Sequence, residues 1–347
     1  MDERDAKDMI GRFKHLFSAT GNDVAEEKTD VSATVSPPTV AEDGPALSLA
    51  DVEREYCTSL LSANALQDVP LSDLEHRVLD EITALLASPD TACDALPRLP
   101  EVLPRLMKSL RDERASWEEI ARVVGQDPLL VAEVLRLANS PCFRVTTKAT
   151  CLEQVVMQLG LVGLREVVVT VSLKPIMKLD GGRYWQQAGR RVWSQALAAA
   201  VACRSLALSL DAGRFEAYLA GLLHNVGMVL VVQSLSCLSQ GDEAPRSIQF
   251  YDQIQPLVKR LSCLIARHWD LPAASVEALR ERAGSALAVS SPLGRILRHG
   301  VHLSMLQALV EDGQVEDPFP YLCALPDVER RACEQALGDI EAQTQSL

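Results

Sequence analysis

The sequence predicts an all-α protein with a two-lobed helical body and a disordered N-terminal extension. Hydrophobic residues make up 48% of the 347 residues but aromatic residues only 4%, a composition that favours aliphatic helices over aromatic-rich sheets as the core. Apolar residues recur at helical spacing along most of the chain. Signals for helix starts and stops also follow one another at short intervals, as in a compact bundle of helices.

The N-terminal extension is expected to have two parts. Residues 1–18 form a short amphipathic helix, which is either a fraying end or a docking helix for a partner. Its apolar residues at helical spacing are Met9, Ile10, Phe13, Leu16 and Phe17. Residues 19–46 contain no Leu, Ile, Met or aromatic side chain. Too little apolar surface is available there to offset chain entropy, so this segment is predicted to be a disordered linker.

Residues 47–93 are predicted to hold accessory helices. One apolar pattern begins at Leu49 and runs through Leu60, and a second begins at Ser72 and ends near Pro89. The following short-helix lobe spans residues 94–180. Its helix starts are marked by possible capping residues at Ser116 with Glu119, Asp127 before a proline, and Thr150 with Glu153.

A second lobe, over residues 183–312, begins after the helix breaker Gly181-Gly182. A long helix should run to about Leu210. Val167–Val171 and Val229–Val232 are rich in β-branched residues, but no other segment could pair with them as strands, so both are predicted as buried helix. A C-terminal helical tail covers 313–347. The further helices are expected at 214–224, 248–269, 272–283, 292–311 and 327–343.

Charge and cysteine content restrict the classes of function. The net charge is −13, which argues against broad electrostatic binding to nucleic acid or to an anionic membrane. The nine cysteines include no Cys-x-x-Cys pair and are typical of a reducing compartment. The charged N-terminus does not resemble a signal peptide, and no apolar stretch is expected to reach the roughly 18 residues that span a bilayer. We therefore expect a soluble, cytoplasmic protein.

Several motifs, in order, resemble the HDOD family, bacterial signalling domains that are related in fold to HD-type metal-dependent phosphohydrolases. The resemblance covers roughly residues 94–310. It implies a two-lobed all-helical domain with a regulatory, non-catalytic role. The motifs are Leu96-Pro97-Arg98-Leu99-Pro100, Ser116 through Asp127-Pro128, Leu135-Arg136-Leu137-Ala138-Asn139-Ser140, Leu159-Gly160-Leu161, His224-Asn225-Val226-Gly227 and Trp269-Asp270-Leu271-Pro272.

The resemblance implies which residues match the HD metal site. Most of these residues lack the side chains that bind the metal in HD enzymes. The adjacent His-Asp pair of HD enzymes is His224-Asn225 here, and the earlier His ligand is matched by Gln195. The later Asp ligand is matched by Val301, and the Lys after the pair by Met228. One imidazole falls far short of the ligands that a catalytic metal needs. We expect a vestigial pocket of these five residues, with no metal, no cofactor and no catalysis.

Other residues could bind a ligand or a partner. His299 and His302 have the spacing of metal ligands on one helix face, but the sequence places no carboxylate or Cys beside them. The candidate contacts with a ligand or partner lie after the second helix of the short-helix lobe, where the alternative is a surface and capping role. They are Arg136, Asn139, Ser140 and Arg144.

These observations predict a non-enzymatic bacterial signal-transduction or scaffold protein that binds a protein partner or a small ligand. By resemblance, the context is regulation of motility, stress response or cyclic-dinucleotide signalling. One alternative is a residual metal-dependent phosphohydrolase acting on a nucleotide or cyclic dinucleotide. Another is a DNA-binding transcriptional regulator, since residues 116–135 resemble a helix-turn-helix. Residues 101–150 carry a balance of only +1, so neither nucleic acid nor membrane is an expected partner.

Overall fold

The computed structural model describes residues 49–61, 67–87, 116–140, 143, 145, 147–177, 182–239, 244–284, 291–315, 322 and 325–344. All of them belong to the second of two compact units, Ala46–Leu347. The predicted segments 1–18 and 19–46 lie outside the described residues, and so does Arg144.

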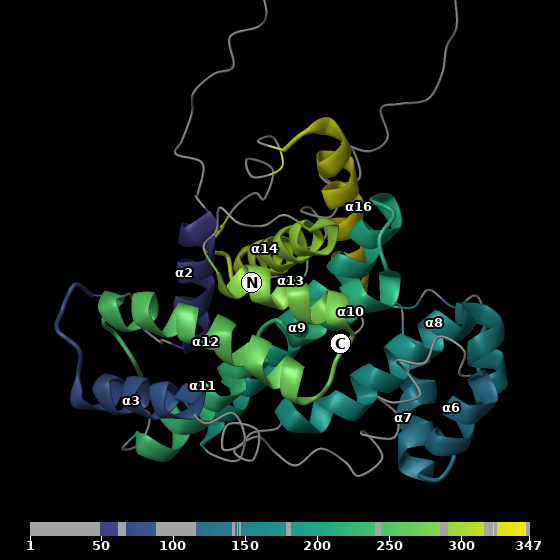
Figure 1. The fold of residues 1–347 in the computed structure, drawn as a ribbon, viewed down its shortest axis with the longest axis horizontal. Helices are drawn as coiled ribbons and strands as arrows, with labels where there is room; N and C mark the ends of the chain where they lie inside the picture. The colour runs from purple at the N-terminus through teal and green to yellow at the C-terminus, as the bar shows by residue number, and fades with distance from the viewer. Residues whose placement is uncertain are drawn as a thin grey trace, which may run out of the picture. The chain divides into compact units, whose positions relative to one another are not determined.

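The all-α prediction is confirmed (Figure 1). The described residues contain no strand, only an isolated bridge between Gln67 and Ser247. Both segments rich in β-branched residues, Val167–Val171 and Val229–Val232, are buried helix as predicted. The helices are α2 (Leu49–Leu61), α3 (Asp73–Ala87), α6 (Trp117–Val124), α7 (Pro128–Ala138), α8 (Leu152–Leu173), α9 (Arg183–Ser209), α10 (Arg214–Leu223), α11 (Val226–Leu238), α12 (Ile248–His268), α13 (Ala273–Ala283), α14 (Pro292–Glu311) and α16 (Asp327–Thr344), with a 3₁₀ turn at Lys174–Met177.

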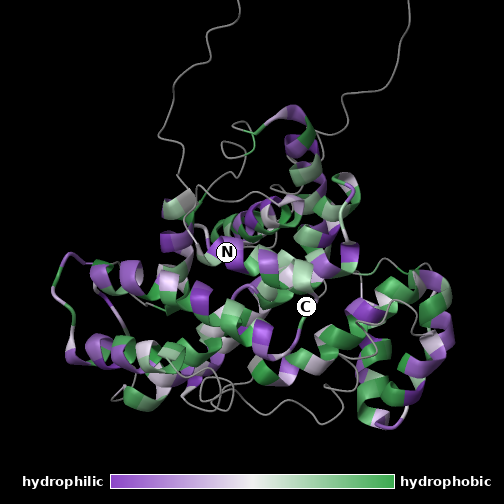
Figure 2. Ribbon diagram, viewed as in Figure 1, coloured by the Kyte–Doolittle hydropathy of each residue, from purple (hydrophilic) through white to green (hydrophobic). Residues whose placement is uncertain are grey.

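The helices form two lobes. In the first, α6 and α7 pack on α8, and α8 in turn contacts α10 of the second lobe. In the second, α9 packs against α10, α14 and α16. Helix α2 lies on α14, α9 and α12, and α3 lies on α11 and α12. The ribbon of α6 and α7 carries both hydrophobic and hydrophilic residues (Figure 2), as expected of helices with one buried face.

Small residues on α9 allow its neighbours to come unusually close. A Cβ on Gly221 of α10 would lie 2.7 Å from the carbonyl oxygen of Ala199. A Cβ on Gly300 of α14 would lie 2.5 Å from Sγ of Cys203. The backbones of α10 and α14 therefore approach α9 at distances that only glycine permits. This packing brings the end of α10 and the middle of α14 to the same stretch of α9.

Local signals predicted some boundaries correctly and others not. Asp127 caps α7 as expected, accepting hydrogen bonds from the amides of Leu129 at 2.9 Å and Leu130 at 3.2 Å. The other two predicted capping boxes are wrong. Ser116 makes no side-chain capping bond, and α8 is capped at Cys151, while the amide of Thr150 donates to Gln154.

Helix α8 is broken at Gly160, within one of the motifs that carry the family resemblance. This residue has φ 69° and ψ 179°, a conformation outside the helical region. Only glycine adopts such a backbone readily, because it has no Cβ to collide with the neighbouring carbonyl. Gly160 therefore sets the direction of α8 as it runs toward the second lobe.

The expectation that no segment could span a membrane is wrong by length and composition. Three helical segments are long and apolar enough: Leu152–Ile176, Arg183–Ser209 and Arg214–Leu238. Between 61% and 94% of their most apolar windows is buried inside the fold. Their hydrophobicity therefore serves the packing of the two lobes, because each segment lies among the other helices.

Candidate functional site

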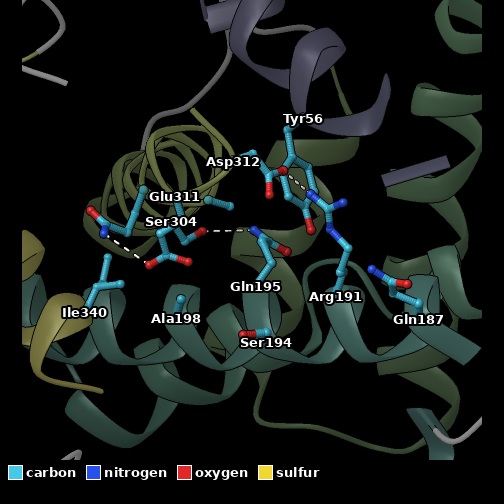
Figure 3. A pocket seen from close by; sticks show the side chains of 12 residues that line it. Tyr56, Gln187, Arg191, Ser194, Gln195, Ala198, Ser304, Glu311, Asp312 and Ile340 are labelled. Atoms are coloured by element: carbon cyan, nitrogen blue, oxygen red, sulfur yellow. Dashed lines mark hydrogen bonds and ion pairs between the residues drawn. The ribbon is translucent and has the colours of Figure 1, made fainter. Parts of the chain in front are cut away.

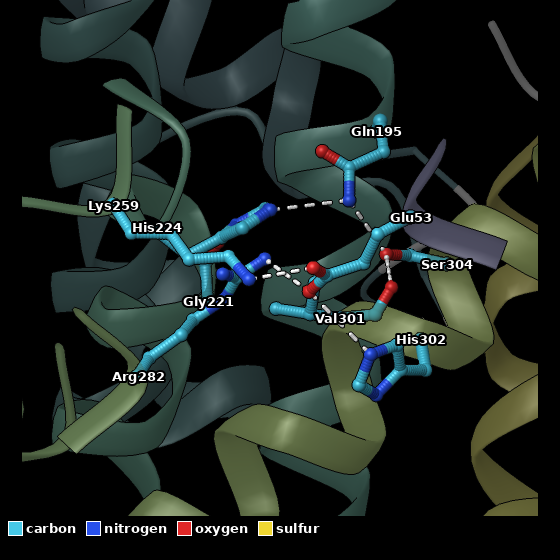
Figure 4. Close-up of polar contacts among 9 residues, drawn as sticks. All are labelled: Glu53, Gln195, Gly221, His224, Lys259, Arg282, Val301, His302 and Ser304. Carbon is cyan, nitrogen blue, oxygen red and sulfur yellow. Dashed lines mark hydrogen bonds and ion pairs between the residues drawn. The ribbon is translucent and has the colours of Figure 1, made fainter. Parts of the chain in front are cut away.

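The residues expected to form a vestigial site lie where α9, α10 and α14 meet. Gln195 lies on α9, and His224 ends α10. Val301 and Ser304 lie one turn apart on α14. The structure brings these side chains together (Figure 4). The residues that the motif order matched to the HD metal ligands, Gln195, His224 and Val301, therefore lie in one region.

His224 uses both ring nitrogens within the protein. Its Nδ1 lies 2.6 Å from the carbonyl oxygen of Gly221. A carbonyl only accepts, so Nδ1 carries the proton and Nε2 holds the lone pair. Nε2 lies 3.2 Å from Nε2 of Gln195, whose amide donates to it. The lone pair that a metal would need is therefore engaged by an amide.

The electrostatic surroundings keep His224 neutral. Burial, followed by the positive charge of Arg282, lowers the pKa of His224 to about 3. The same Gln195 amide nitrogen lies 2.9 Å from Oγ of Ser304. That hydroxyl donates in turn to the carbonyl of Val301 at 2.8 Å. Three helices are thus joined by one chain of hydrogen bonds at this position.

The other two residues of the predicted pocket are buried in α11. Asn225 is 6% exposed and Met228 2% exposed. Asn225 is the N-cap of α11 but makes no side-chain capping bond. Whether these two side chains line the same pocket as Gln195 stays a prediction.

Sequence reasoning missed an acidic residue that enters the site from α2. One carboxylate oxygen of Glu53 lies 2.5 Å from Nζ of Lys259. The other lies 3.3 Å from a guanidinium nitrogen of Arg282 and 3.5 Å from Nε2 of His302. These groups come from α12, α13 and α14. We call these four residues the Glu53 cluster; they lie beside His224 and Gln195 in Figure 4.

The Glu53 cluster is largely removed from water. The exposed fractions of the side chains are 15% for Glu53, 21% for Lys259, 12% for Arg282 and 6% for His302. Burial opposes ionisation of Glu53, but Arg282, His302 and Lys259 outweigh it and hold its pKa well below the usual range. Burial lowers the pKa of His302. At neutral pH the cluster is therefore one carboxylate facing two cations and a neutral imidazole.

A weak signal for Glu53 was present in the sequence. The buried face of α2 repeats at helical spacing through Val52, Tyr56 and Leu60. Glu53 precedes buried Cys57 by four residues and therefore lies on the edge of that apolar face. An acid at such a position indicates a buried charge with a partner, but the sequence does not identify the partner.

The expectation that no carboxylate lies near His299 and His302 is wrong. Nε2 of His302 lies near Glu53, and Nε2 of His299 lies 3.3 Å from a carboxylate oxygen of Glu329 on α16. Burial lowers the pKa of His299 to about 4, although Glu329 opposes this. The two imidazoles contact different carboxylates. Among the described residues, no three His, Cys, Asp or Glu side chains are arranged to hold a metal ion.

The residues present do not fit the divalent metal of HD enzymes. The His224 lone pair is taken, Gln195 and Val301 supply no anionic ligand, and both oxygens of Glu53 already contact charged or polar groups. Lys259 and Arg282 add two positive charges beside the position. Like charges repel a cation strongly where water is excluded. The arrangement is suited to an anion and not to a metal ion.

A hollow of about 280 Å³ borders this site and is lined by α2, α9, α14 and α16 (Figure 3). Gln195 and Ser304 form part of its wall, and Tyr56 of α2 forms another part. Arg191 pairs with Asp312 at its edge. The hollow therefore adjoins the chain of hydrogen bonds between Gln195 and Ser304.

Two of the candidate contacts of the short-helix lobe, Arg136 and Asn139, have partners within the protein. Arg136 pairs with Glu133 at 2.7 Å. The amide of Asn139 donates to the carbonyls of Leu135 at 2.7 Å and Ala149 at 2.8 Å, which ties the end of α7 to the segment before α8. Ser140 is half-buried. A ligand role for these residues stays a prediction.

Comparisons with known proteins agree with this fold. The HDOD domain model matches residues 96–284. An uncharacterized protein from Treponema pallidum (strain Nichols) is 27% identical over 211 residues, which cover 58% of this chain and 40% of that protein. The chain thus matches about two fifths of that relative's length.

Solved structures share the fold. A protein from Shewanella amazonensis SB2B, described provisionally as a phosphohydrolase, has a TM-score of 0.55 at 21% identity, covering 75% of this chain and 98% of that one. An HDOD domain protein with unknown function from Geobacter sulfurreducens has a TM-score of 0.53 at 20% identity, covering 79% of this chain and 94% of that one. With more than half of its residues matched by the family model, and with this fold, the chain belongs to the HDOD domain family.

Proposed function

We propose that this protein is a non-catalytic signal-transduction component of the cytoplasm that acts by binding a protein partner or a small ligand. One observation carries the proposal. The Gln195 amide donates to the His224 nitrogen that would otherwise bind a metal, at 3.2 Å. Catalysis by metal-activated water requires an open metal position. Here hydrogen bonds that join α9, α10 and α14 engage the groups that would surround such a metal.

The Glu53 cluster supports the same proposal. Lys259 and Arg282 place two cations beside the site, and both pair with one carboxylate of the protein itself. A hydrolase that works through divalent ions gains nothing from buried cations at the metal position. Such a site is better suited to holding the protein in one conformation or to recognising an anion. Both are properties of a regulatory domain.

The test combines metal content with hydrolysis. Full-length protein without a tag would be purified without chelator from cells supplied with iron, manganese and zinc, and its metals measured by elemental analysis. We expect less than about a tenth of an equivalent of each metal. We also expect no cleavage of bis(p-nitrophenyl) phosphate or of a cyclic dinucleotide with added manganese. Near-stoichiometric metal together with turnover would refute the proposal and favour the phosphohydrolase alternative.

A matched variant shows that the assay can detect a restored site. The triple substitution Gln195→His, Asn225→Asp and Val301→Asp returns the three lost ligand types to their positions. We expect it to retain more metal than wild type under the same purification. If the wild-type protein retains as much metal as this variant, the site does not depend on the ligands described here.

A further inference from the structure

Polar side chains from three helices contact one carboxylate that belongs to a fourth helix. Lys259, Arg282 and His302 converge on Glu53, and Glu53 belongs to α2, which precedes the matched family region at residues 96–284. Without Glu53, Lys259 and Arg282 would be two largely buried cations with no anion between them. Burial of like charges without a counter-charge is strongly unfavourable. The three residues of α12, α13 and α14 therefore form a site that requires an anion.

Glu53 does not use all the hydrogen-bonding capacity of that site. Within the described part of the chain, the buried Nη1 atom of Arg282 has no hydrogen-bond partner. Buried donors are almost always satisfied, so an unused guanidinium nitrogen requires an explanation. An anion with more oxygens than a carboxylate would satisfy it.

A phosphate group has the chemistry that this site lacks. Its tetrahedral oxygens can accept from the ammonium of Lys259, both terminal nitrogens of Arg282 and the imidazole of His302 at once. A planar carboxylate presents only two oxygens, and both already contact the cluster. Arginine is also well suited to two-point contact with phosphate. The donor set therefore favours a phosphate over a carboxylate ligand.

The adjoining hollow gives such a ligand a place for its remaining atoms. Tyr56 lies three residues after Glu53 on α2 and lines the hollow together with Gln195 and Ser304. Its hydroxyl is buried and has no hydrogen-bond partner in the described part of the chain. A shift of α2 would withdraw Glu53 and Tyr56 together, since both lie on one helix. The hollow and the cluster would then form one continuous site.

We propose that Lys259, Arg282 and His302 form a binding site for the phosphate group of a small molecule. In the absence of that ligand, the carboxylate of Glu53 on α2 occupies the site. Ligand phosphate replaces the Glu53 carboxylate, and α2 loses its main polar attachment to α12, α13 and α14. The release of α2 thereby transmits ligand binding to a partner that contacts the N-terminal part of the chain. This inference deepens the proposed function and rests on its non-catalytic site.

The first experiment compares thermal unfolding of full-length proteins in sodium phosphate and in sodium chloride at equal ionic strength. The variants are Glu53→Gln and, as a matched control on the exposed face of α2, Glu55→Gln. We expect phosphate to raise the midpoint of Glu53→Gln by at least about 3 °C more than that of wild type or Glu55→Gln. Adding Arg282→Gln to Glu53→Gln should remove this gain. An equal phosphate effect in all proteins, or a gain that survives Arg282→Gln, would overturn the proposal.

The second experiment uses the wild-type protein, so its result does not depend on whether Glu53→Gln folds. Hydrogen exchange of residues 49–61 would be measured with and without saturating inorganic phosphate, again at equal ionic strength. We expect exchange in α2 to rise at least about threefold, while exchange in α16 stays unchanged. Unchanged exchange in α2 at saturating phosphate would refute displacement of Glu53. Either failure leaves the non-catalytic proposal standing, since only metal retention with hydrolysis refutes that.

Discussion

The amide Nε2 of Gln195 lies 3.2 Å from the imidazole Nε2 of His224, and it donates to the lone pair that a metal ion would otherwise take. The opposite ring nitrogen is held at 2.6 Å from the Gly221 carbonyl, which fixes the tautomer. Both partners are buried. The imidazole thereby forms a structural link between α9 and α10.

Restoring the aspartate of the His-Asp pair alone should not create an enzyme. In Asn225→Asp, His224 stays bonded to Gln195, and Val301 still supplies no ligand, so a metal would have too few anchors. We expect metal content and phosphodiester cleavage to remain at the wild-type background, measured by elemental analysis and with bis(p-nitrophenyl) phosphate. Measurable cleavage by this single variant would show that the remaining ligands lie elsewhere in the chain.

Acidification should weaken the fold through His224. Its pKa is lowered to about 3 in the folded state from an ordinary 6.5. As the pH falls, the His224 imidazole therefore becomes protonated near pH 6.5 in the unfolded chain but only near pH 3 in the folded protein. Stability from this residue is complete above pH 6.5 and is lost as the pH falls below it. Between pH 7 and pH 5 the loss is about 2 kcal/mol.

Urea unfolding of wild type, His224→Gln and His76→Gln at pH 7 and pH 5 checks this prediction. His76 is exposed on α3 and serves as the matched control. We expect the pH dependence of the unfolding free energy to shrink by about 2 kcal/mol in His224→Gln and to stay near the wild-type value in His76→Gln. An unchanged pH dependence in His224→Gln would mean that this imidazole is not held neutral.

The sequence predicted most of the fold because local signals coincide with the packing. The breaker at Gly181-Gly182 and the helix expected over 292–311 place the beginnings of α9 and α14 within about a residue or two of the observed ones. The motif order placed Gln195 and His224 together. Glu53 could not be predicted in the site, because its partners lie on three helices far away in sequence and only tertiary packing unites them.

Gly221 should not tolerate a methyl group. Its Cβ would lie 2.7 Å from the Ala199 carbonyl oxygen and 2.8 Å from the Ala200 Cα, both of them backbone atoms that cannot rotate away. We expect Gly221→Ala to lower the free energy of unfolding by about 3 kcal/mol, as for strong overpacking. Gly338 on α16 has no atom within 4 Å of such a Cβ. There Gly338→Ala should stabilise by about 0.5–1 kcal/mol, because alanine favours a helix.

Glu166 should be the strongest polar link between the two lobes. It lies on α8 with a fully buried side chain, 3.4 Å from Arg204 of α9 and 2.9 Å from Arg214 of α10. Arg204 is held further by the Phe143 ring, with its guanidinium carbon 5.2 Å from the ring centre. Removal of the anion breaks both ion pairs with Glu166. We expect Glu166→Gln to lower the free energy of unfolding by about 3 kcal/mol.

The exposed Glu81 of α3 provides the control, since Glu81→Gln removes the same charge from the protein without touching a buried pair. We expect that variant to unfold within about 0.5 kcal/mol of wild type in urea. Hydrogen exchange should rise in α8 and α10 of Glu166→Gln before it rises in α14, because α8 joins the lobes through α10. Equal stability of the two variants would show that apolar packing between α8 and α10, and not the buried ion pairs, holds the lobes together.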